Sequence, residues 1–554
     1  MAIIPGNTRF IGISPTVDLT EKKSARLNSE QEPYTMADFQ ESISPDLAPI
    51  SVDGESVGIA ADPTATTQSV AVIQSSTTNA GLVLNPNGTG AIMANIPDGT
   101  VAGGTARGQY AVDLQMIRGF NYEVSSGPYS FAAGFGCAAS GRSSIAMGER
   151  NTASGLRSTA IGGGAGAGQG VNATNSYATA VGGLQNNASG QYSGVFSGFV
   201  NTASSSYSTI SGGQSNTAST GSHATVVGGY GNVASGQNSI AGGLGSVASG
   251  LSSIALGESN TASGPRSVAL GRACSAGEYS IVAGNANQGT GTGSVVFGYS
   301  NNSGSRNYAT ISGGISNSIS SNSHATVVGG STNTASGQYS VAGGIGNVSS
   351  SQASTTFGYG NTAANTWSFA VGGFNYAAGE FSAAFGQKSS TYLQGQHAIA
   401  SDRFGGTADA QQSLLTARKQ DTLASAATTV LSLDGTGTTN LIIPLNNNRA
   451  WNVTVKWVAV VTSITGTATG VSVGDTMMQV DTFGFKKISG TSSMVGSANT
   501  LSTNNDTSMA TAAMGYTAGT SQELKLTFTA PTFTGGGSVT CRVVAKVELT
   551  EVAY

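Results

Sequence analysis

Residues 253–271 read SIALGESNTASGPRSVALG and carry the same five-residue motif, Ser-x-Ala-x-Gly, at both ends. Between the two copies lies NTASG, residues 260–264, an element rich in turn-forming residues. Outward from this stretch the motif recurs from about Ser130 to Ser390, with 18 closing glycines, most of them 14 residues apart. A regular short period predicts a solenoid. Further copies are SIAMG (144–148), STAIG (158–162) and SAAFG (382–386), beside SIALG (253–257) and SVALG (267–271) of the quoted stretch.

The alternation of side chains along each strand predicts two unlike faces. Ser, Ala and Gly should share one face, and the intervening Ile, Val, Met, Leu or Phe the other. We expect the large residues to fill a narrow interior and the small ones to let a neighbouring backbone come close. One unit cannot bury its apolar row alone, so stacked units should form a continuous core. At about 4.8 Å per coil, 18 coils would extend roughly 85 Å.

A longer repeat lies within the short one. The heptapeptide HATVVGG occurs at His223–Gly229 and again at His324–Gly330, an offset of 101 residues, which indicates that a block of units was duplicated. The two histidines therefore occupy equivalent places. In a trimer, three copies of either could meet on the axis and bind a metal or an anion; the alternative is a stacked surface group.

These repeats resemble the YadA-like head repeat of trimeric adhesins, in both the 14-residue period and the SxAxG and ASG residue types. The resemblance covers roughly half of the chain. It implies a left-handed parallel β-roll built from three chains, so a homotrimer is expected.

Composition excludes several classes of protein. The 554 residues include 80 Gly, and only 9% are charged, against about a quarter in a typical globular protein. A net charge of −4 gives no basic patch for nucleic acid. Three distant cysteines, Cys137, Cys274 and Cys541, argue against a disulfide framework and for assembly in a reducing cytoplasm. We expect no signal peptide, because MAIIPGNTRF (1–10) has no basic region followed by a long apolar run. We expect no membrane insertion, because no stretch approaches 18 apolar residues.

The region before the repeats is expected to connect them to a partner. Residues 1–60 are charged and interrupted by prolines, and we interpret them as a virion-attachment segment, with Phe10, Tyr34 and Phe39 as anchor residues. Residues 61–129 form a predicted connector, mostly β. Within it, GLVLNPNGTGAIMANIPDGT (81–100) and ARGQYAVDLQ (106–115) resemble a segment that precedes such repeats in phage fibre proteins.

The region after the repeats changes character. Residues 391–420 are predicted to be a linker, partly helical, and residues 421–554 a β-sandwich tip, because long alternating strands follow one another there. Trp451 and Trp457 alternate with polar residues and are expected in its core. The candidate receptor-binding residues are aromatics in loop-rich stretches, for which core or trimer-interface packing is the alternative: Phe483, Phe485, Tyr516 and Phe533.

Hydrolytic activity would need two carboxylates roughly 5–9.5 Å apart. The repeat region has no Asp and few Glu, of which Glu258 and Glu278 are near enough in sequence to lie on adjacent coils. Solvated corner residues are the simpler interpretation, and Asp475 and Asp481 are interpreted as loop and strand-edge residues. The sequence therefore predicts no enzyme, no cofactor and no metal site.

Together these features predict an all-β, homotrimeric fibre: an extended N-terminal anchor, a β-roll shaft over residues 130–390 and a C-terminal tip that binds a host glycan or protein. We interpret it as a bacteriophage tail fibre, located on the virion. The alternatives are a head fibre or decoration protein, a depolymerising tailspike and a bacterial trimeric adhesin.

Overall fold

The computed structural model describes residues 89–164, 169–321, 323–402, 410–436, 448–519 and 523–553. The chain divides into two compact units, residues 1–90 and 91–554, and nearly all described residues belong to the second. Within the described residues, every regular element is a β-strand except the 3-10 helix η1, Thr507–Met509. The predicted anchor residues Phe10, Tyr34 and Phe39 lie outside the described residues.

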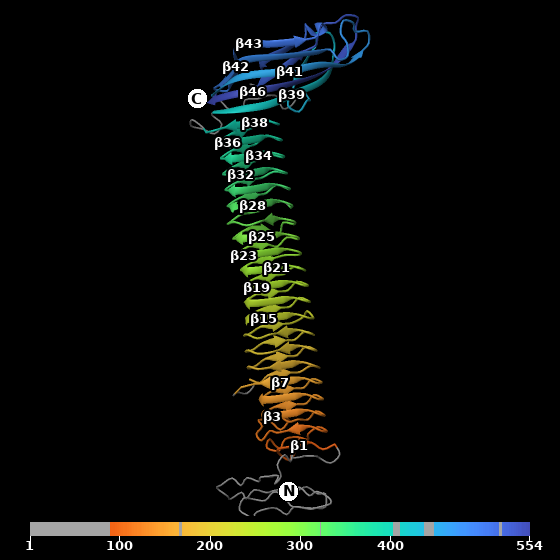
Figure 1. The fold of residues 1–554 in the computed structure, drawn as a ribbon, viewed down its shortest axis with the longest axis vertical. Helices are drawn as coiled ribbons and strands as arrows, with labels where there is room; N and C mark the ends of the chain where they lie inside the picture. The colour runs from red at the N-terminus through yellow and green to blue at the C-terminus, as the bar shows by residue number, and fades with distance from the viewer. Residues whose placement is uncertain are drawn as a thin grey trace, which may run out of the picture. The chain divides into compact units, whose positions relative to one another are not determined.

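The repeats form stacked coils, each contributing one strand to a long-strand sheet. Successive strands pair in parallel, so that Ala255 lies beside Ala269, and Figure 1 shows them one above another from β1 to β38. We call this stack the shaft; it extends beyond residues 130–390 at both ends. Its long-strand sheet consists of β1 (Ile92–Met93), β2 (Val112–Asp113), β3 (Phe131–Phe135), β5 (Ile145–Glu149), β7 (Thr159–Gly162), β9 (Thr179–Val181), β11 (Gly194–Val195), β13 (Thr209–Ile210), β15 (Thr225–Tyr230), β17 (Ile240–Leu244), β19 (Ile254–Glu258), β21 (Val268–Arg272), β23 (Ile281–Asn285), β25 (Val295–Tyr299), β27 (Thr310–Ile311), β28 (Thr326–Ser331), β30 (Val341–Ile345), β32 (Thr355–Tyr359), β34 (Phe369–Gly373), β36 (Ala383–Gln387) and β38 (His397–Ala400).

The turn-like NTASG elements form a second, short-strand layer, also parallel and in register, as the pairing of Ala262 with Ala276 shows. It is interrupted once, so that two sheets of 12 and 5 strands result. Its strands are β4 (Ala138–Ala139), β6 (Thr152–Ala153), β8 (Asn172–Ala173), β10 (Asn187–Ala188), β12 (Thr202–Ala203), β14 (Thr217–Ala218), β16 (Val233–Ala234), β18 (Val247–Ala248), β20 (Thr261–Ala262), β22 (Ser275–Ala276), β24 (Gln288–Gly289), β26 (Asn302–Gly304), β29 (Thr334–Ala335), β31 (Val348–Ser349), β33 (Thr362–Ala363), β35 (Tyr376–Ala377) and β37 (Ser390–Thr391).

The interior of the shaft is filled by small residues, so the predicted orientation of the two faces is wrong. Ala255 of a long strand and Ala262 of the following short strand are both 0% exposed, and the same holds along the stack. The large residues of the long strands point outward instead. In most coils the two thin layers meet through alanines, and in a few the inward residue of the long strand is Val or Ile, as at Ile210 and Ile311.

A ladder of buried asparagines runs along one edge of this interior. Each Asn side chain accepts a hydrogen bond from the backbone amide of the next ladder residue and donates to glycine carbonyls; Asn333, for example, donates to Gly344 O at 2.6 Å and accepts from Asn347 N at 3.0 Å. Cys137 and Cys274 take this position in two coils, where each thiol donates to a glycine carbonyl. These two cysteines are therefore part of the core, in the reduced form.

In coils longer than 14 residues, the extra residue forms a bulge at a pair of adjacent glycines. The register between β15 and β17 shifts after Val226, and Gly229 rather than Gly228 pairs with Gly243. The duplicated coil does the same, with Gly330 paired with Gly344. The closing glycine of these coils is thus the second of the pair, one residue later than the motif spacing predicts, because the bulge precedes it.

The C-terminal strands form two antiparallel sheets around one core, an arrangement consistent with the predicted β-sandwich. One sheet has the order β39-β46-β41-β42-β43 and the other β40-β45-β44. Trp457 and Phe528, one from each sheet, pack edge to face at 6.1 Å between centroids. The strands are β39 (Ala410–Leu423), β40 (Thr428–Leu431), β41 (Arg449–Thr465), β42 (Thr476–Ile488), β43 (Thr491–Asn505), β44 (Ala513–Ala518), β45 (Leu524–Thr529) and β46 (Ser538–Ala553).

Strand β39 corrects the prediction of a partly helical linker over residues 391–420. Its residues alternate between the core and the surface, and it pairs with β46 along all 14 of its residues. At its start β39 also pairs with β38, His397 lying opposite Leu414, so the shaft sheet runs directly into the C-terminal domain.

Candidate interaction surfaces

The outward side chains of the long strands form an apolar surface that one chain leaves uncovered. Met147 is 37% exposed and Val227 is 55% exposed, although both lie in regular strands of the shaft. Parallel sheets are normally covered on both faces, so a surface of this kind marks an interaction site. We call it the outer apolar face; its most exposed members include Ile145, Met147, Phe196, Val227, Leu270, Ile281, Phe297, Val328 and Ile399.

A second surface runs along the corner that precedes each long strand. Here Tyr177, Tyr192, Tyr207 and His223 succeed one another in four coils, all with positive φ, and their rings stack with centroids 4.6–4.9 Å apart. We call these four residues the tyrosine column. The left-handed conformation costs about 1–2 kcal/mol per residue, and ring stacking offsets it by about 0.5–1.5 kcal/mol.

The two histidines of the duplicated block lie in such stacks. The ring of His223 is nearly parallel to that of Tyr207, with 1° between the planes, and His324 lies between Tyr308 and Tyr339. Both side chains are exposed, which agrees with the stacked surface group considered from the sequence. The signal for these stacks was present in the sequence, as a tyrosine directly before the motif serine in successive units.

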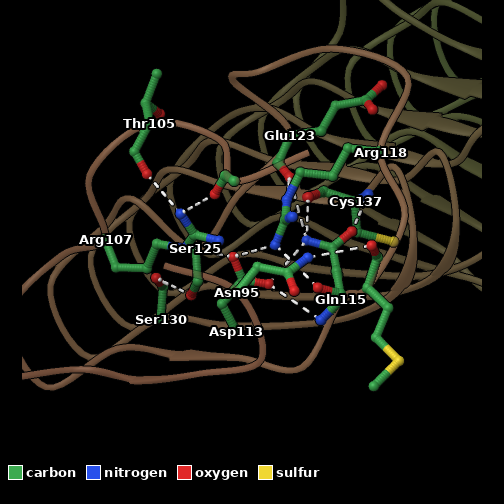
Figure 2. A network of polar contacts seen from close by, with 12 residues as sticks. Asn95, Thr105, Arg107, Asp113, Gln115, Arg118, Glu123, Ser125, Ser130 and Cys137 are labelled. Atoms are coloured by element: carbon green, nitrogen blue, oxygen red, sulfur yellow. Dashed lines mark hydrogen bonds and ion pairs between the residues drawn. The ribbon is translucent and has the colours of Figure 1, made fainter. Parts of the chain in front are cut away.

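The first described coils of the shaft contain a buried polar network, shown in Figure 2. Asp113 accepts hydrogen bonds from Arg107 Nε at 2.7 Å and Arg118 Nη2 at 3.1 Å, and all three side chains are essentially inaccessible. Gln115 accepts from the backbone amide of Cys137 at 2.5 Å, so its amide acts as the first rung of the asparagine ladder. This buried network orders the first described coils of the stack.

The structure places two of the four predicted receptor-binding aromatics in the core. Phe483 and Phe485 are 4% and 1% exposed, which agrees with the core packing considered for them from the sequence; they alternate on β42 toward the opposite sheet. Tyr516 and Phe533 are partly buried and pack against the same core, Tyr516 with its ring 4.7 Å from that of Phe483. Trp451 and Trp457 are core residues, as predicted.

Beneath these rings lies a buried carboxylate. Asp481, in the middle of β42 and not at a strand edge, accepts hydrogen bonds from Trp457 Nε1 at 3.1 Å and Tyr516 Oη at 2.5 Å. Gln479 and Thr500 donate to its other oxygen at 2.6 and 2.7 Å. Burial, and then the hydrogen bond to Asp481, raises the pKa of Tyr516. With four donors and no open face, the group orders the core.

The carboxylates considered for hydrolysis do not form a pair. Glu258 is the last residue of β19 and contacts Arg272 at 3.3 Å. Glu278 precedes the first residue of β23, so the two carboxylates lie beside opposite ends of their strands. Asp475 accepts hydrogen bonds from Ser472 and Ser508 in the C-terminal domain. Within the described residues no group of three or more His, Cys, Asp or Glu side chains could hold a metal ion. The same residues include no helix long and apolar enough to cross a membrane.

Comparison with known proteins bears on the repeats. A family model for the YadA head domain repeat matches in two places, at residues 139–165 and 248–272. The shaft carries YadA head repeats. The matched segments fall within the stacked coils, so the resemblance inferred from residue types and period is confirmed, as is the all-β solenoid.

The other comparisons add little. No curated protein matches the chain. Among solved structures, the crystal structure of the Acinetobacter baumannii phage AM24 tailspike protein aligns with 9% identity and a TM-score of 0.19, over 83% of this chain and 76% of that one. A likeness at that level carries no argument about fold or function.

Proposed function

We propose that the chain is the subunit of a homotrimeric bacteriophage fibre, most simply a tail fibre, which adheres to the host cell and has no enzymatic activity. The observation that carries this proposal is the outer apolar face, which runs the length of a shaft made of YadA head repeats. A single chain would expose this row to water along its length. Two further copies of the same face would cover it.

The energetics favour assembly through this face. Each half-exposed Leu, Ile, Met or Phe that loses its remaining contact with water stabilises the assembly by about 1 kcal/mol. Because the face repeats with every coil, the contributions accumulate along the shaft. A closed threefold arrangement also buries the face in every chain, whereas an open arrangement would leave one copy exposed.

Light scattering of the purified protein tests the assembly. The expected mass is three times the 55.0 kDa of one chain, independent of concentration in the micromolar range. A monomeric mass would contradict the proposal, because the shaft would then tolerate its apolar row in water.

Attachment to the virion and to the host are assigned to the two ends of the chain. We propose that residues 1–60 bind the particle and that the C-terminal domain, which follows β38 directly, binds a glycan or protein on the cell. Labelled protein should bind host cells, and an antibody to the C-terminal domain should block this binding while one to the shaft should not. Equal blocking by both would contradict the assignment of the tip.

A bacterial trimeric adhesin is the second candidate, since YadA head repeats also form adhesin heads. Detection of the protein in purified phage particles supports the fibre, and detection on uninfected cells supports the adhesin. A head fibre would be distinguished by immunogold labelling of the particle. A depolymerising tailspike would release oligosaccharides from host capsule, which the fibre is not expected to do.

A further inference from the structure

Near the C-terminal end of the shaft the surface is hollowed by an open groove of about 440 Å³. Its lining comes from successive coils: Thr362 on β33 and Tyr376 on β35 are register partners, and Phe374 and Lys388 occupy the corners before β35 and β37. The side chain of Tyr392, directly after β37, closes one end. The groove follows the short-strand layer, and the outer apolar face belongs to the other sheet.

The rings of the groove differ from those of the tyrosine column. In the column, Tyr192 lies parallel to its neighbours on both sides, at 9° and 6°, so both of its faces are covered. In the groove, Tyr376 and Tyr392 are tilted by 53° with centroids 6.1 Å apart. Phe374 meets Tyr359 edge to face at 88°. Tilted rings leave part of their faces open, and a flat ligand with an apolar side can pack there.

Glycine at position 360 makes room for one of these rings. A Cβ on Gly360 would lie 2.9 Å from Cδ1 of Phe374. The ring therefore rests over the backbone of the preceding coil, and Phe374 remains 47% exposed while Tyr376 is 37% exposed. The position of the Phe374 ring is thus set by its packing against the preceding coil.

The positive charge of Lys388 in the groove lining is balanced by the carboxylate of Asp402 beside it. Lys388 Nζ lies 2.6 Å from Asp402 Oδ1, and the lysine side chain is largely buried, at 18% exposure. A lysine paired in this way still has N–H donors for a hydroxyl oxygen, and the carboxylate can accept from a hydroxyl. Thr362 adds a hydroxyl to the lining. Since the charge of the lysine is already balanced, the groove has no excess positive charge for an acidic ligand.

Open aromatic faces beside paired donors and acceptors fit one chemical class. From this geometry we infer that the groove binds a neutral pyranose unit of a polysaccharide, with the C–H face of the sugar on Tyr376 and Tyr392 and its hydroxyls toward Lys388 and Thr362. The biological use of such a site, recognition of a surface glycan from the side of the shaft, rests on the proposed adhesive function; the binding itself does not.

Saturation-transfer difference NMR on the full-length protein tests the site. The probes are the methyl β-glycosides of glucose, galactose and N-acetylglucosamine, with methyl glucuronide as the charged comparison. At least one neutral glycoside should show transfer to the protons of one sugar face. The transfer should fall about tenfold in Tyr376→Ala and in Tyr392→Ala, and should persist in Tyr376→Phe, which keeps the ring. Tyr192→Ala, in the tyrosine column, is the matched control and should bind as the wild type does.

Three results would overturn the inference: no transfer to any neutral glycoside, equal transfer in wild type and in Tyr376→Ala, or a preference for the glucuronide. Thermal melting of each variant separates loss of the ligand from loss of the fold. Binding of the same variants to host cells is measured in parallel. If Tyr376→Ala leaves cell binding unaffected, the adhesive function stands but does not use this site. If the groove binds sugar but the protein does not bind cells, the site stands and the adhesive function does not.

Discussion

Asn333 shows, at the scale of one residue, what holds successive coils together. Its side-chain amide donates to Asn317 Oδ1 at 3.0 Å and to Gly344 O at 2.6 Å, and its oxygen accepts from Asn347 N at 3.0 Å. It is fully buried, so each of these groups would otherwise lack a partner. A ladder of such residues fixes the register of every coil against the next.

We therefore expect Asn333→Ala to lower the free energy of unfolding by about 1–3 kcal/mol, because a buried amide and a buried carbonyl lose their partners. Thr334→Ala, the adjacent outward position on β29, is the control and should change stability by less than about 0.5 kcal/mol. Thermal melting followed by circular dichroism measures both. Equal effects would show that the ladder is not what orders the coils.

Cys137 occupies a ladder position with a titratable group. Burial raises the pKa of its thiol to about 11, from an ordinary value of 9.0. In the unfolded chain the thiol ionises first, so the stability that the protonated form supplies is complete below pH 9 and is lost as the pH rises toward 11. A shift of two pH units corresponds to about 2–3 kcal/mol.

Cys137→Asn, which restores the ladder amide, should remove this dependence. The melting temperature of the wild type should fall more steeply than that of the variant between pH 8 and pH 10.5, and the gap should widen with pH. Comparison of the two slopes cancels the titration of all other groups. Parallel curves would contradict a buried, protonated thiol at this position.

At the scale of the element, the closing glycines set how closely the long strands stack. Gly243, at the end of the motif in β17, has a φ of +104°, and a Cβ there would lie 1.9 Å from Gly257 O. Gly245, two residues later, has a φ of +62° but only one atom, Ser259 Oγ, within 4 Å. The two glycines share a left-handed conformation and differ in the space beside them.

Gly243→Ala should consequently destabilise the shaft far more than Gly245→Ala. The second change carries only the conformational cost of about 1–2 kcal/mol, whereas the first also forces two coils apart. Hydrogen exchange monitored by mass spectrometry should show loss of protection in β17 and β19 for Gly243→Ala alone. Similar exchange in both variants would mean that the stack yields easily at this point.

The period of these elements was predictable from the sequence, and the orientation of their faces was not. Ser-x-Ala-x-Gly alternates small and large residues whichever side is buried, and only the short strand, with its own inward alanine, decides the matter. In this coil Ala255 and Ala262 meet inside, and Leu256 lies on the outer face of the strand. The proposed trimer would cover the outward large residues, and a contact between chains cannot be recognised in the sequence of one chain.

The C-terminal domain shows a second limit of the same kind. Strand β39 contains good helix formers, Gln411, Leu414 and Leu415 among them, and local propensity favours a helix. Pairing with β46 over its whole length overrides that preference. Phe483 and Phe485 were assigned to loops for a related reason: the strand that buries them is defined by partners that are distant in sequence.

On the scale of the whole described unit, the two ends of the described shaft differ. At the first described coils, Asp113 on β2, beside Met93 on β1, and its two arginines form a buried polar cluster. At the last coil, β39 crosses β38 antiparallel and ends the parallel stack. An open end of a regular stack is a template for further pairing, so the antiparallel strand β39 prevents further coils from adding at this end.

Lateral association is a separate question, and a matched pair of substitutions tests the proposed role of the outer apolar face. Leu270 lies on the outer apolar face, and Ser275 lies outward on the other sheet of the same coil. Leu270→Asp places three carboxylates near the axis of a trimer, where each is poorly solvated. It should shift the mass in solution toward 55.0 kDa, while Ser275→Asp keeps three times that mass. If Ser275→Asp dissociates the assembly and Leu270→Asp does not, the chains meet through the short-strand layer, and the pyranose groove would then lie at the interface instead of on the free surface.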